Sequence, residues 1–340
     1  MLNIRRPAHA GLIPQTDKWE KPNEDEINVL KNCLGDFIAY SIQKKIDIYP
    51  ENLIGCYRVI GKNSIFIKVL SDKHYESQLN AEKIASWLYQ SGLKVNYIKD
   101  GFPKKINNKL WVFVYNYIDH IFSDRSDQQL YLIGKEIGFM HKLMREYPDR
   151  HIVKERGSNE NLRLLEQLKN IKKDCEFENF HNIAIKIIKN VSYSDFKLLT
   201  NNAQLIHGDL NYGNVLIDKE TKKPIIIDFE DATSAWLSPL YDLALVLQRF
   251  ILMSKRQDKF QSADSLIKGY LTENKLNGLV KSSTLIKILE LISVRPLLII
   301  SILPMNQRNL YLDEIEKFIE LYKKTQADKD LISDIEALIC

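Results

Sequence analysis

The polar residues whose types and spacing could perform chemistry lie between positions 205 and 242 of the chain. Three polar groups there each adjoin a short apolar run: His207-Gly208-Asp209, Asn214 and Asp228-Phe229-Glu230. Two carboxylates and an amide in this order suit phosphoryl transfer. In that reaction one carboxylate accepts or orients the proton of the attacking hydroxyl, while an amide oxygen and a second carboxylate hold Mg²⁺ against the nucleotide phosphates.

Two apolar runs predict the elements that position these side chains. Val215–Ile217 and Ile225–Ile227 are expected to form a small hairpin, because both are short, apolar and joined by a turn at 219–223. Asn214 precedes the first strand and Asp228 follows the second, so the hairpin would bring both to the same end. Each residue alone has an ordinary explanation, since an Asp after a Gly is usually a turn residue. The functional interpretation therefore rests on the fixed spacing of the whole set.

The pattern HGDLNYGNVL, followed by IIIDFEDA and then DLA, resembles the aminoglycoside phosphotransferase family, within the wider choline-kinase-like and protein-kinase-like group. The resemblance implies that Asp209 is the catalytic base and that Asn214 and Asp228 are Mg²⁺ ligands. It also implies that His207 is the histidine that braces the catalytic loop.

Two further residues are interpreted as structural support. The resemblance implies a buried structural aspartate at Asp242. The preceding Ser238-Pro239 also suits the N-cap and first position of a helix, which would place Asp242 at the positive end of the helix dipole. Both interpretations of Asp242 can hold together. His141, in the stretch FMHKL, is similar to a helix histidine of the family and is expected to be structural.

The resemblance also predicts a nucleotide-binding lysine and glutamate upstream. Lys68, in the β-branched run 66–70, is similar to the lysine that binds the α- and β-phosphates. Taken alone, a lysine there would more often be an exposed strand residue. Glu82, on the next helix, is similar to the glutamate that pairs with this lysine. Glu76 is the competing position, but it lies too near the start of the helix.

Two other parts of the nucleotide site are marked less clearly. Trp111–Tyr117 resembles the hinge strand of kinases, so backbone groups from Asn116 to Ile118 are expected to bind adenine. A Gly-rich phosphate loop should precede Lys68, but Tyr49–Val59 contains only Gly55. The residues of the phosphate loop and the choice between ATP and GTP therefore stay open.

Three features favour a small-molecule kinase over a protein kinase. Glu230 stands where protein kinases have Gly, and Gly208 stands where they usually have Arg. The segment from Asp228 to Ser238 leaves no room for a long activation loop. We therefore expect no activation by phosphorylation of such a loop.

The remaining periodicity predicts an α+β, bilobal, protein-kinase-like fold. Residues 1–23 are expected to be an extended leader, 24–118 an N-lobe with a five-stranded antiparallel sheet that binds nucleotide, and 119–340 a mainly helical C-lobe with the catalytic hairpin and the substrate-binding helices. The expected helices are 24–43, 76–91, 127–147, 158–173, 181–200 and several from 239 onward, and the expected strands of the sheet are 46–48, 53–60, 64–70, 95–98 and 109–118.

Composition excludes several classes of protein. The 340 residues include 48 Lys and Arg and 44 Asp and Glu, with 45% hydrophobic residues, which is typical of a globular chain. A net charge of +4 carried by scattered pairs argues against nucleic-acid binding. The balanced charge of 251–340 gives no support to a polycationic substrate.

The spacing of the cysteines and the hydropathy of the chain indicate where in the cell the protein is expected to act. Four well-separated cysteines argue against a zinc site and a disulfide framework: Cys33, Cys56, Cys175 and Cys340. The apolar stretch 285–303 contains Lys287, Glu290, Arg295 and Pro296, so it predicts a buried helix rather than a membrane span. Residues 1–15 contain no apolar segment of the kind found in secretory signal peptides. These features predict a soluble cytoplasmic protein that does not bind membranes.

The favoured function is ATP-dependent transfer of a γ-phosphate, with Mg²⁺, to a hydroxyl of a small molecule such as an antibiotic, amino sugar, sugar or amino alcohol. ATP is the expected donor and GTP the alternative. A nucleotide-binding pseudokinase with a scaffolding role is the second hypothesis, motivated by the sparse Gly loop. A protein kinase is the third and is disfavoured by the short segment after Asp228. The acceptor, its hydroxyl and the oligomeric state stay open.

Overall fold

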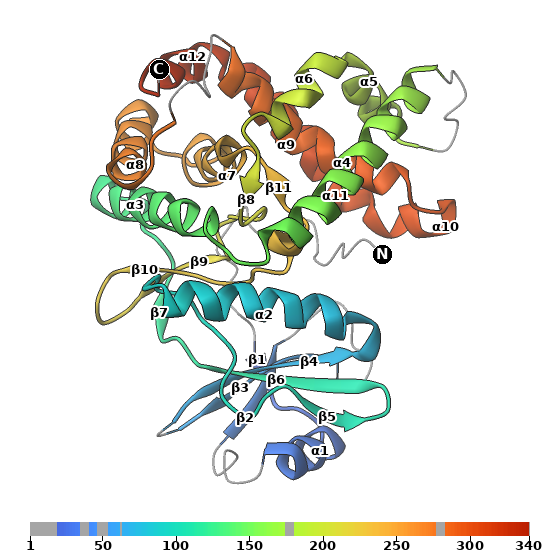
Figure 1. Ribbon diagram of the computed structural model, residues 1–340, viewed down its shortest axis with the longest axis vertical. Coiled ribbons are helices and arrows are strands. Elements are labelled where there is room, and N and C mark those ends of the chain that lie inside the picture. Colours follow the sequence, from blue (N-terminus) through green and yellow to red (C-terminus); the bar gives the residue numbers. More distant parts are fainter. Residues whose placement is uncertain are drawn as a thin grey trace. The chain divides into compact units, whose positions relative to one another are not determined.

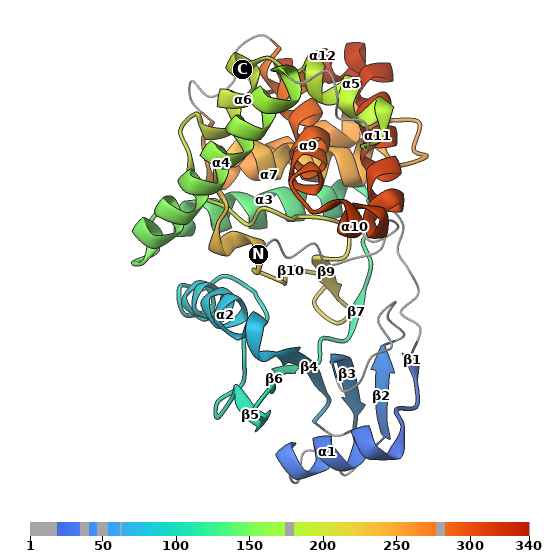
Figure 2. The same cartoon turned by 90° about the vertical axis from the view of Figure 1, so that its right-hand side faces the viewer.

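The computed structural model describes residues 19–34, 41–45, 54–61, 63–173, 180–276 and 283–339. The chain divides into two compact units (Figures 1 and 2). The sheet unit comprises the described residues up to Ile121 together with Ile217–Glu230. The helical unit comprises Phe122–Leu216 and the described residues from Asp231 onward. The lobe boundary near Ile118 stays a prediction, and the sheet unit additionally takes in a later segment of the chain.

The sheet unit is organised around a six-stranded antiparallel sheet with the strand order β1-β2-β3-β4-β6-β5. Its strands are β1 (Trp19–Glu20), β2 (Ser41–Lys45), β3 (Gly55–Ile60), β4 (Ile65–Ser71), β5 (Lys104–Asn107) and β6 (Leu110–Asn116). The antiparallel sheet is as predicted, but among the described residues it has six strands rather than five. The edge strands β1 and β5 are short and polar, which protects an exposed edge from further pairing and also removes the apolar pattern that predicts a strand.

One of the predicted strands is not a strand of this sheet, and another cannot be compared with it. Residues 46–48 lie outside the described part of the chain. Residues 95–98 form isolated bridges rather than a strand, from Val95 to Ile226 and from Ile98 to Tyr115.

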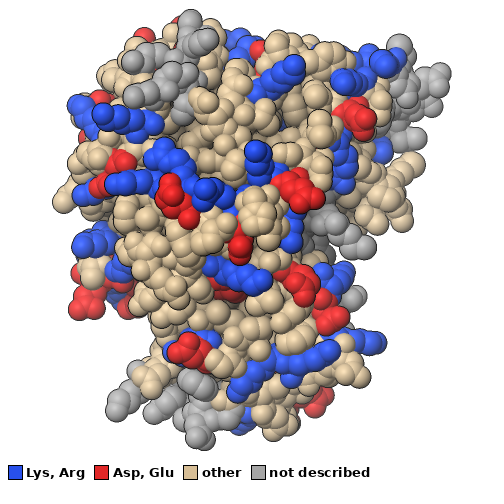
Figure 3. Space-filling model, viewed as in Figure 1, with Lys and Arg blue, Asp and Glu red and all other residues tan. Residues whose placement is uncertain are grey.

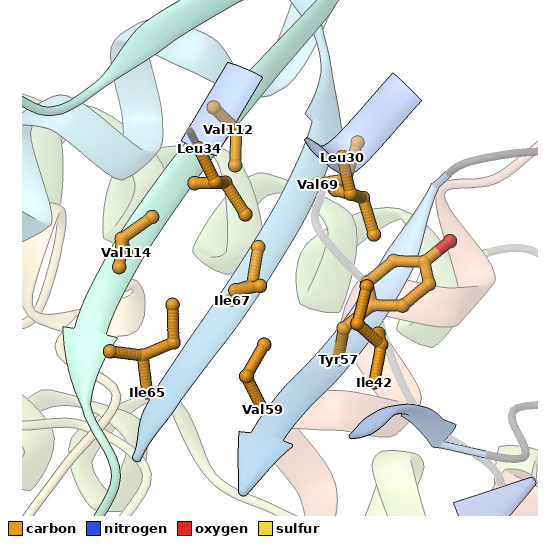
Figure 4. Packing of buried hydrophobic residues seen from close by; sticks show 10 residues of the cluster. All are labelled: Leu30, Leu34, Ile42, Tyr57, Val59, Ile65, Ile67, Val69, Val112 and Val114. Atoms are coloured by element: carbon orange, nitrogen blue, oxygen red, sulfur yellow. The ribbon is translucent and has the colours of Figure 1, made fainter. Parts of the chain in front are cut away.

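Helix α1 (Glu24–Leu34) covers one face of the sheet. Figure 4 shows its leucines packed against alternating side chains of four strands; the buried cluster consists of Leu30, Leu34, Ile42, Tyr57, Val59, Ile65, Ile67, Val69, Val112 and Val114. The prediction of one helix from 24 to 43 is wrong, because Ser41–Lys45 forms β2. Ile42 fits helical and strand periodicity equally, and pairing with Val59 of β3 decides in favour of the strand.

The opposite face of the sheet carries Lys68. Side chains alternate between the two faces of a strand, so Phe66, Lys68 and Leu70 of β4 point away from α1. Leu70 belongs to a second buried cluster with Phe113 and Tyr115 of β6. Helix α2 (Tyr75–Gln90) follows β4, and its buried residues include Glu82.

The hairpin predicted from the two apolar runs is present. Strands β9 (Val215–Asp218) and β10 (Pro224–Ile226) are neighbours in a three-stranded sheet with the order β10-β9-β7, where β7 is His120–Ile121. Lys222, in the connecting turn, has a φ of +56°.

The helical unit contains most of the helices (Figure 1). They are α3 (Asp127–Met144), α4 (Arg150–Lys173), α5 (Asn182–Asn190), α6 (Tyr193–Lys197), α7 (Pro239–Val246), α8 (Lys259–Glu273), α9 (Thr284–Ser301), α10 (Met305–Arg308), α11 (Leu312–Ala327) and α12 (Lys329–Ala337). A π-helical turn, η5 (Leu247–Leu252), continues α7. A two-stranded sheet pairs β8 (Gln204–Leu205) with β11 (Trp236–Leu237).

Two predicted helix boundaries in this unit are wrong. Helix α4 begins at Arg150 rather than at Ser158, so Ser158 lies inside a helix and caps nothing. The helix expected over 181–200 is two helices, because Ser192 starts α6 through a reciprocal capping box with Asp195.

Helix α9 is the buried helix predicted for 285–303, and most of its residues are inaccessible to solvent. Its charged residues are paired: Lys287 Nζ lies 3.2 Å from Glu290 Oε2, and Arg295 forms an ion pair with Glu160. Within the described ranges, the helices all fall short of the length and apolar character that crossing a membrane requires. Figure 3 shows basic and acidic side chains interspersed on the face that it presents.

Candidate active site

The loop after β8, in the helical unit, carries Asp209 and holds it through side-chain hydrogen bonds. Asn211 and Asn214 donate from their amide nitrogens to Asp209 Oδ2, over 2.7 and 3.0 Å. Asn214 also donates to the backbone carbonyl of Asp209, over 2.8 Å. Asp209 is partly exposed, and its Oδ1 accepts no hydrogen bond within the described part of the chain. The loop therefore presents one oriented carboxylate oxygen that can accept a proton.

Asn211 is a site residue that the sequence analysis did not identify. Its Oδ1 accepts a hydrogen bond from the backbone nitrogen of Gly213, over 2.8 Å, while its amide nitrogen holds Asp209. Asn side chains commonly bond the backbone two residues further on. An Asn two positions after a candidate base was therefore the available signal.

Asp242 anchors the start of the same loop. It is fully buried, and its carboxylate accepts hydrogen bonds from the backbone nitrogens of His207 and Gly208, over 2.8 and 2.9 Å. His141 Nε2 lies 3.0 Å from Asp242 Oδ2 and His141 Nδ1 lies 2.9 Å from the Tyr270 hydroxyl. Since a carboxylate only accepts, Nε2 is the nitrogen that donates here. Asp242 also lies in the first turn of α7, after the N-cap Ser238. It is therefore both a buried aspartate and an acid at the positive end of the helix dipole.

The neighbouring residues explain the loop's unusual sequence. His207 is fully buried, and its Nδ1 accepts a hydrogen bond from the backbone nitrogen of Asp209, over 3.2 Å. Gly208 has a φ of +86°, and a Cβ atom there would lie 2.9 Å from Ala235 Cβ. Both the backbone conformation and the space exclude a larger side chain at this position.

Lys68 and Asp228 meet within the sheet unit. The Lys68 ammonium lies 3.2 Å from Asp228 Oδ1 and 3.3 Å from Glu230 Oε1, and all three side chains are largely buried. Burial by itself lowers the pKa of Lys68, but the two carboxylates outweigh it and raise that pKa above its ordinary value. Asp228 has a φ of +69°, in the left-handed region where strained residues concentrate at functional sites.

Glu82 is near Lys68 electrostatically but has other hydrogen-bond partners. Its Oε1 accepts from Gln78 Nε2 and from the Tyr115 hydroxyl, each over 2.7 Å. Its Oε2 is buried with no partner among the described residues, and burial raises the pKa of this carboxyl. The resemblance implies an ion pair between Lys68 and Glu82; among the described residues, Lys68 pairs instead with the two carboxylates after β10.

The predicted hinge residues have intramolecular partners. The carbonyl of Asn116 accepts from Asn96 Nδ2 over 3.2 Å, and the Asn116 side chain accepts from Lys99 over 2.7 Å. His120 Nδ1 lies 2.9 Å from the carbonyl of Ile118. Adenine binding at these backbone groups stays a prediction.

Magnesium binding by Asn214 and Asp228 stays a prediction. The described residues contain no group of three or more His, Cys, Asp or Glu side chains placed to hold a metal ion. The predicted ligands are instead one amide, Asn214, and one carboxylate, Asp228, whose oxygens suit Mg²⁺. Cys33 and Cys56, the cysteines within the described ranges, are free thiols.

The structure therefore assembles two sets of the predicted residues. Asp209, Asn214, His207 and Asp242 come together in the helical unit, while Lys68, Asp228 and the nearby Glu82 come together in the sheet unit. Glu230, Gln78 and Tyr115 join the second set without having been assigned roles. Gln78 was detectable because it lies one helical turn before Glu82; the contact with Tyr115 depends on the packing of α2.

A family model and several solved structures resemble this chain. The model of the phosphotransferase enzyme family, APH, matches residues 63–272. No curated protein matches the chain in sequence.

Solved structures share the fold at low sequence identity. An amicoumacin kinase in complex with AMP-PNP and Ca²⁺ is 17% identical, with a TM-score of 0.57 over 92% of this chain and 95% of that one. A GDP complex of aminoglycoside 2′-phosphotransferase IIIa is 17% identical, with a TM-score of 0.58 over 90% of this chain and 98% of that one. A microcompartment-associated aminopropanol kinase is 14% identical, with a TM-score of 0.51 over 93% of this chain and the whole of that one.

Proposed function

The chain belongs to the APH family of phosphotransferases, and we propose that it transfers the γ-phosphate of a nucleoside triphosphate to a hydroxyl group of a small molecule. The observation that carries the proposal is the state of Asp209. Two amides hold one of its carboxylate oxygens, and the other accepts no hydrogen bond within the described part of the chain. Such a carboxylate can orient an acceptor hydroxyl and take its proton.

The reaction balances as an in-line displacement. The acceptor oxygen forms a bond to the γ-phosphorus, the bond from that phosphorus to the bridging oxygen breaks, and the nucleoside diphosphate leaves. Asp209 receives the proton of the acceptor hydroxyl. Little covalent work falls to the protein, so orientation of the hydroxyl and neutralisation of charge account for most of the catalysis.

Asn214 and Asp228 are the proposed ligands of Mg²⁺. The amide nitrogen of Asn214 is engaged by Asp209, which leaves the oxygen as the end of that amide with the chemistry to bind a hard cation. When bound, the ion would neutralise charge on the nucleotide phosphates. A similar fold described with AMP-PNP and Ca²⁺ supports binding of a nucleotide together with a divalent cation.

Lys68 is the proposed phosphate-binding residue. Asp228 and Glu230 raise the pKa of its ammonium, which therefore carries the positive charge that phosphate binding requires. We propose ATP as the donor and GTP as the alternative, to be measured side by side, because similar folds are described with AMP-PNP and with GDP.

Replacing Asp209 by Asn tests the proposal. Asn at this position keeps an oxygen for the two amide donors but cannot take a proton, so the transfer rate is expected to fall by about 10²- to 10⁴-fold with an unchanged melting temperature. The measurement is nucleoside diphosphate release, coupled to product detection, over a panel of hydroxylated antibiotics, amino sugars, sugars and amino alcohols.

Asp149→Asn, at an exposed position, is the matched control and should retain wild-type transfer. Near-wild-type transfer by the Asp209 variant would contradict the proposal. Tight nucleotide binding by the wild-type protein without transfer to any acceptor would favour a pseudokinase, and label on a partner protein would favour a protein kinase.

A further inference from the structure

The helical unit holds a buried guanidinium that none of the roles above uses. Arg249 lies in η5 and is only 6% exposed. Its Nη1 is buried with no hydrogen-bond partner among the described residues, and none of their carboxylates lies within ion-pair distance of it. Its Cζ lies 6.0 Å from the centre of the Phe318 ring. A buried cation without a partner is costly, so its presence calls for a ligand or a counter-charge.

A second cation approaches the same ring from α11, which contacts η5. Lys317 Nζ lies 4.7 Å from the centre of the Phe318 ring and 2.5 Å from Glu314 Oε2. The Lys317 side chain is 10% exposed. Lys317 thus has a carboxylate partner, whereas Arg249 has none within the described ranges.

Contacts in the helical unit connect these cations to the loop of Asp209. The ring of Tyr212, in that loop, lies 4.9 Å from the ring of Phe250, the residue after Arg249. The charge of Asp209 acts on both cations and raises the pKa of each. Arg249 and Lys317 therefore lie within electrostatic range of the proposed catalytic base.

The nearby carboxylates of Asp209 and Glu314 do not offset the effect of burial on the pKa values of the two cations. Burial lowers the pKa of Arg249 to about 10, and the opposing effect of Asp209 and Glu314 is smaller. Burial also lowers the pKa of Lys317, even though Glu314 is in contact with it. An additional negative charge at this place would stabilise both cations, whereas an additional positive charge would destabilise them.

We propose that Arg249 and Lys317 form a subsite for an anionic group of the acceptor, so that the acceptor is a hydroxylated small molecule carrying a carboxylate or a phosphate group rather than a polycation. The proposal rests on the function proposed above, because it takes Asp209 as the group that receives the acceptor's proton. A guanidinium offers paired N–H donors whose geometry matches both oxyanions. The rate-determining chemistry is unchanged; the subsite places the acceptor by its charge.

Matched acceptor pairs test the charge preference in the wild-type protein. The pairs are glycerate and glycerol, gluconate and sorbitol, and serine and serinol. Glycerol 3-phosphate is added as an acceptor with a phosphate group, and kanamycin as a polycationic acceptor. The member of each pair that carries a carboxylate is expected to have a kcat/KM at least tenfold above that of its counterpart without one. Comparing glycerol 3-phosphate with glycerate shows whether a phosphate or a carboxylate group is preferred. Equal or better transfer to the neutral members or to kanamycin overturns the subsite.

Variants then assign the preference to the two cations. Arg249→Met keeps the apolar stem and removes the charge, and it is expected to raise KM for the anionic acceptor by about 10- to 100-fold while KM for ATP changes less than threefold. Arg249→Lys should recover part of the loss, and Lys317→Met should give a smaller loss. An increase confined to KM for ATP would place the guanidinium at the nucleotide and overturn the proposal.

Arg308→Met is the matched control, because its guanidinium also lies over an aromatic ring of the same unit, 5.9 Å from the centre of Phe180. Binding of glycerate, gluconate and glycerol 3-phosphate is measured separately by calorimetry, without nucleotide. Anion binding that is lost in Arg249→Met, with no transfer to any acceptor, would support the subsite while the proposed function fails. Wild-type protein that binds none of these anions and phosphorylates only uncharged acceptors would retain the function and overturn the subsite.

Discussion

Asp209 and Glu82 have carboxylates with similar hydrogen bonds, but they differ in burial and therefore in the chemistry that they suit. In each, one oxygen accepts two side-chain hydrogen bonds and the other has no partner among the described residues. Asp209 is partly exposed, whereas Glu82 is only 6% exposed and burial raises its pKa. The solvated carboxylate suits proton transfer, while the buried one is held at a cost in stability.

That cost predicts a pH dependence. Because the pKa of Glu82 is higher in the folded protein than in the unfolded chain, the folded protein retains a proton that the unfolded chain has released. Stability therefore decreases as the pH rises from the ordinary pKa of a glutamate to the raised value. Glu82→Gln removes this dependence and is expected to raise the free energy of unfolding by about 1 kcal/mol at pH 8.

Urea unfolding of the wild-type protein and the Glu82→Gln variant between pH 4 and pH 8 measures the effect, and the difference should shrink toward the acid end. Glu76→Gln, at an exposed position of the same helix, serves as the control and should show no such trend. A Glu82→Gln variant that is less stable than wild type at pH 8 would show that the charged carboxylate is well compensated.

Among the elements, α3 and α8 pack with their backbones unusually close. A Cβ atom at Gly134 would lie 2.0 Å from the carbonyl oxygen of Leu266, and one at Gly269 would lie 2.0 Å from that of Tyr131. The same pair of helices carries His141 and Tyr270, which bond each other and support Asp242. The close approach of these helices therefore helps to position the loop of Asp209.

Gly134→Ala is expected to force the two helices apart. Because the obstructing atom is a backbone oxygen that cannot rotate away, the substitution should cost about 1–3 kcal/mol or more in stability. It should also lower transfer activity by displacing the support of Asp242. Thermal unfolding and activity are measured together, with Lys135→Ala, at the adjacent half-exposed position of α3, as the control. Unchanged stability of Gly134→Ala would mean that the helices can separate without loss.

At the scale of the whole molecule, the two sets of site residues belong to different compact units. Lys68, Asp228 and Glu230 are within the sheet unit, and Asp209 and Asn214 are within the helical unit. The proposed roles of Lys68 and Asp209 divide in the same way, since Lys68 serves the nucleotide while Asp209 serves the acceptor. Binding measurements can therefore separate the two roles.

Nucleotide binding should stabilise the molecule through mass action. ATP with Mg²⁺ at about 100 times its Kd is expected to add about 2.7 kcal/mol to the free energy of unfolding, seen as a rise in melting temperature. Lys68→Met should lose most of this rise, because phosphate binding loses its positive charge. Asp209→Asn should retain it, because Asp209 acts on the acceptor.

Lys135→Met is the control lysine, since its side chain is half exposed. Loss of the nucleotide-dependent rise in Asp209→Asn but not in Lys68→Met would reverse the proposed roles of the two residues.

Local spacing in the sequence determined the parts of the site that lie within a few residues of one another. The interval from Asp209 to Asn214 closes a single loop by hydrogen bonds, and the two apolar runs after it form the predicted hairpin. The order of strand, helix and strand around Lys68 and Glu82 could be predicted from the sequence for the same reason. Such features depend on backbone geometry over one turn or one strand, which neighbouring residue types control directly.

Long-range packing decided the rest. Lys68 pairs with Asp228, 160 residues later, rather than with Glu82, and His141 reaches Asp242 across 101 residues. Ile42 becomes part of a strand, and Arg249 becomes a buried cation beside Phe318. No local pattern encodes these outcomes, because each depends on which surfaces of distant elements exclude water together. The sequence alone therefore determined the kind of chemistry, and the tertiary structure determined which charges surround it.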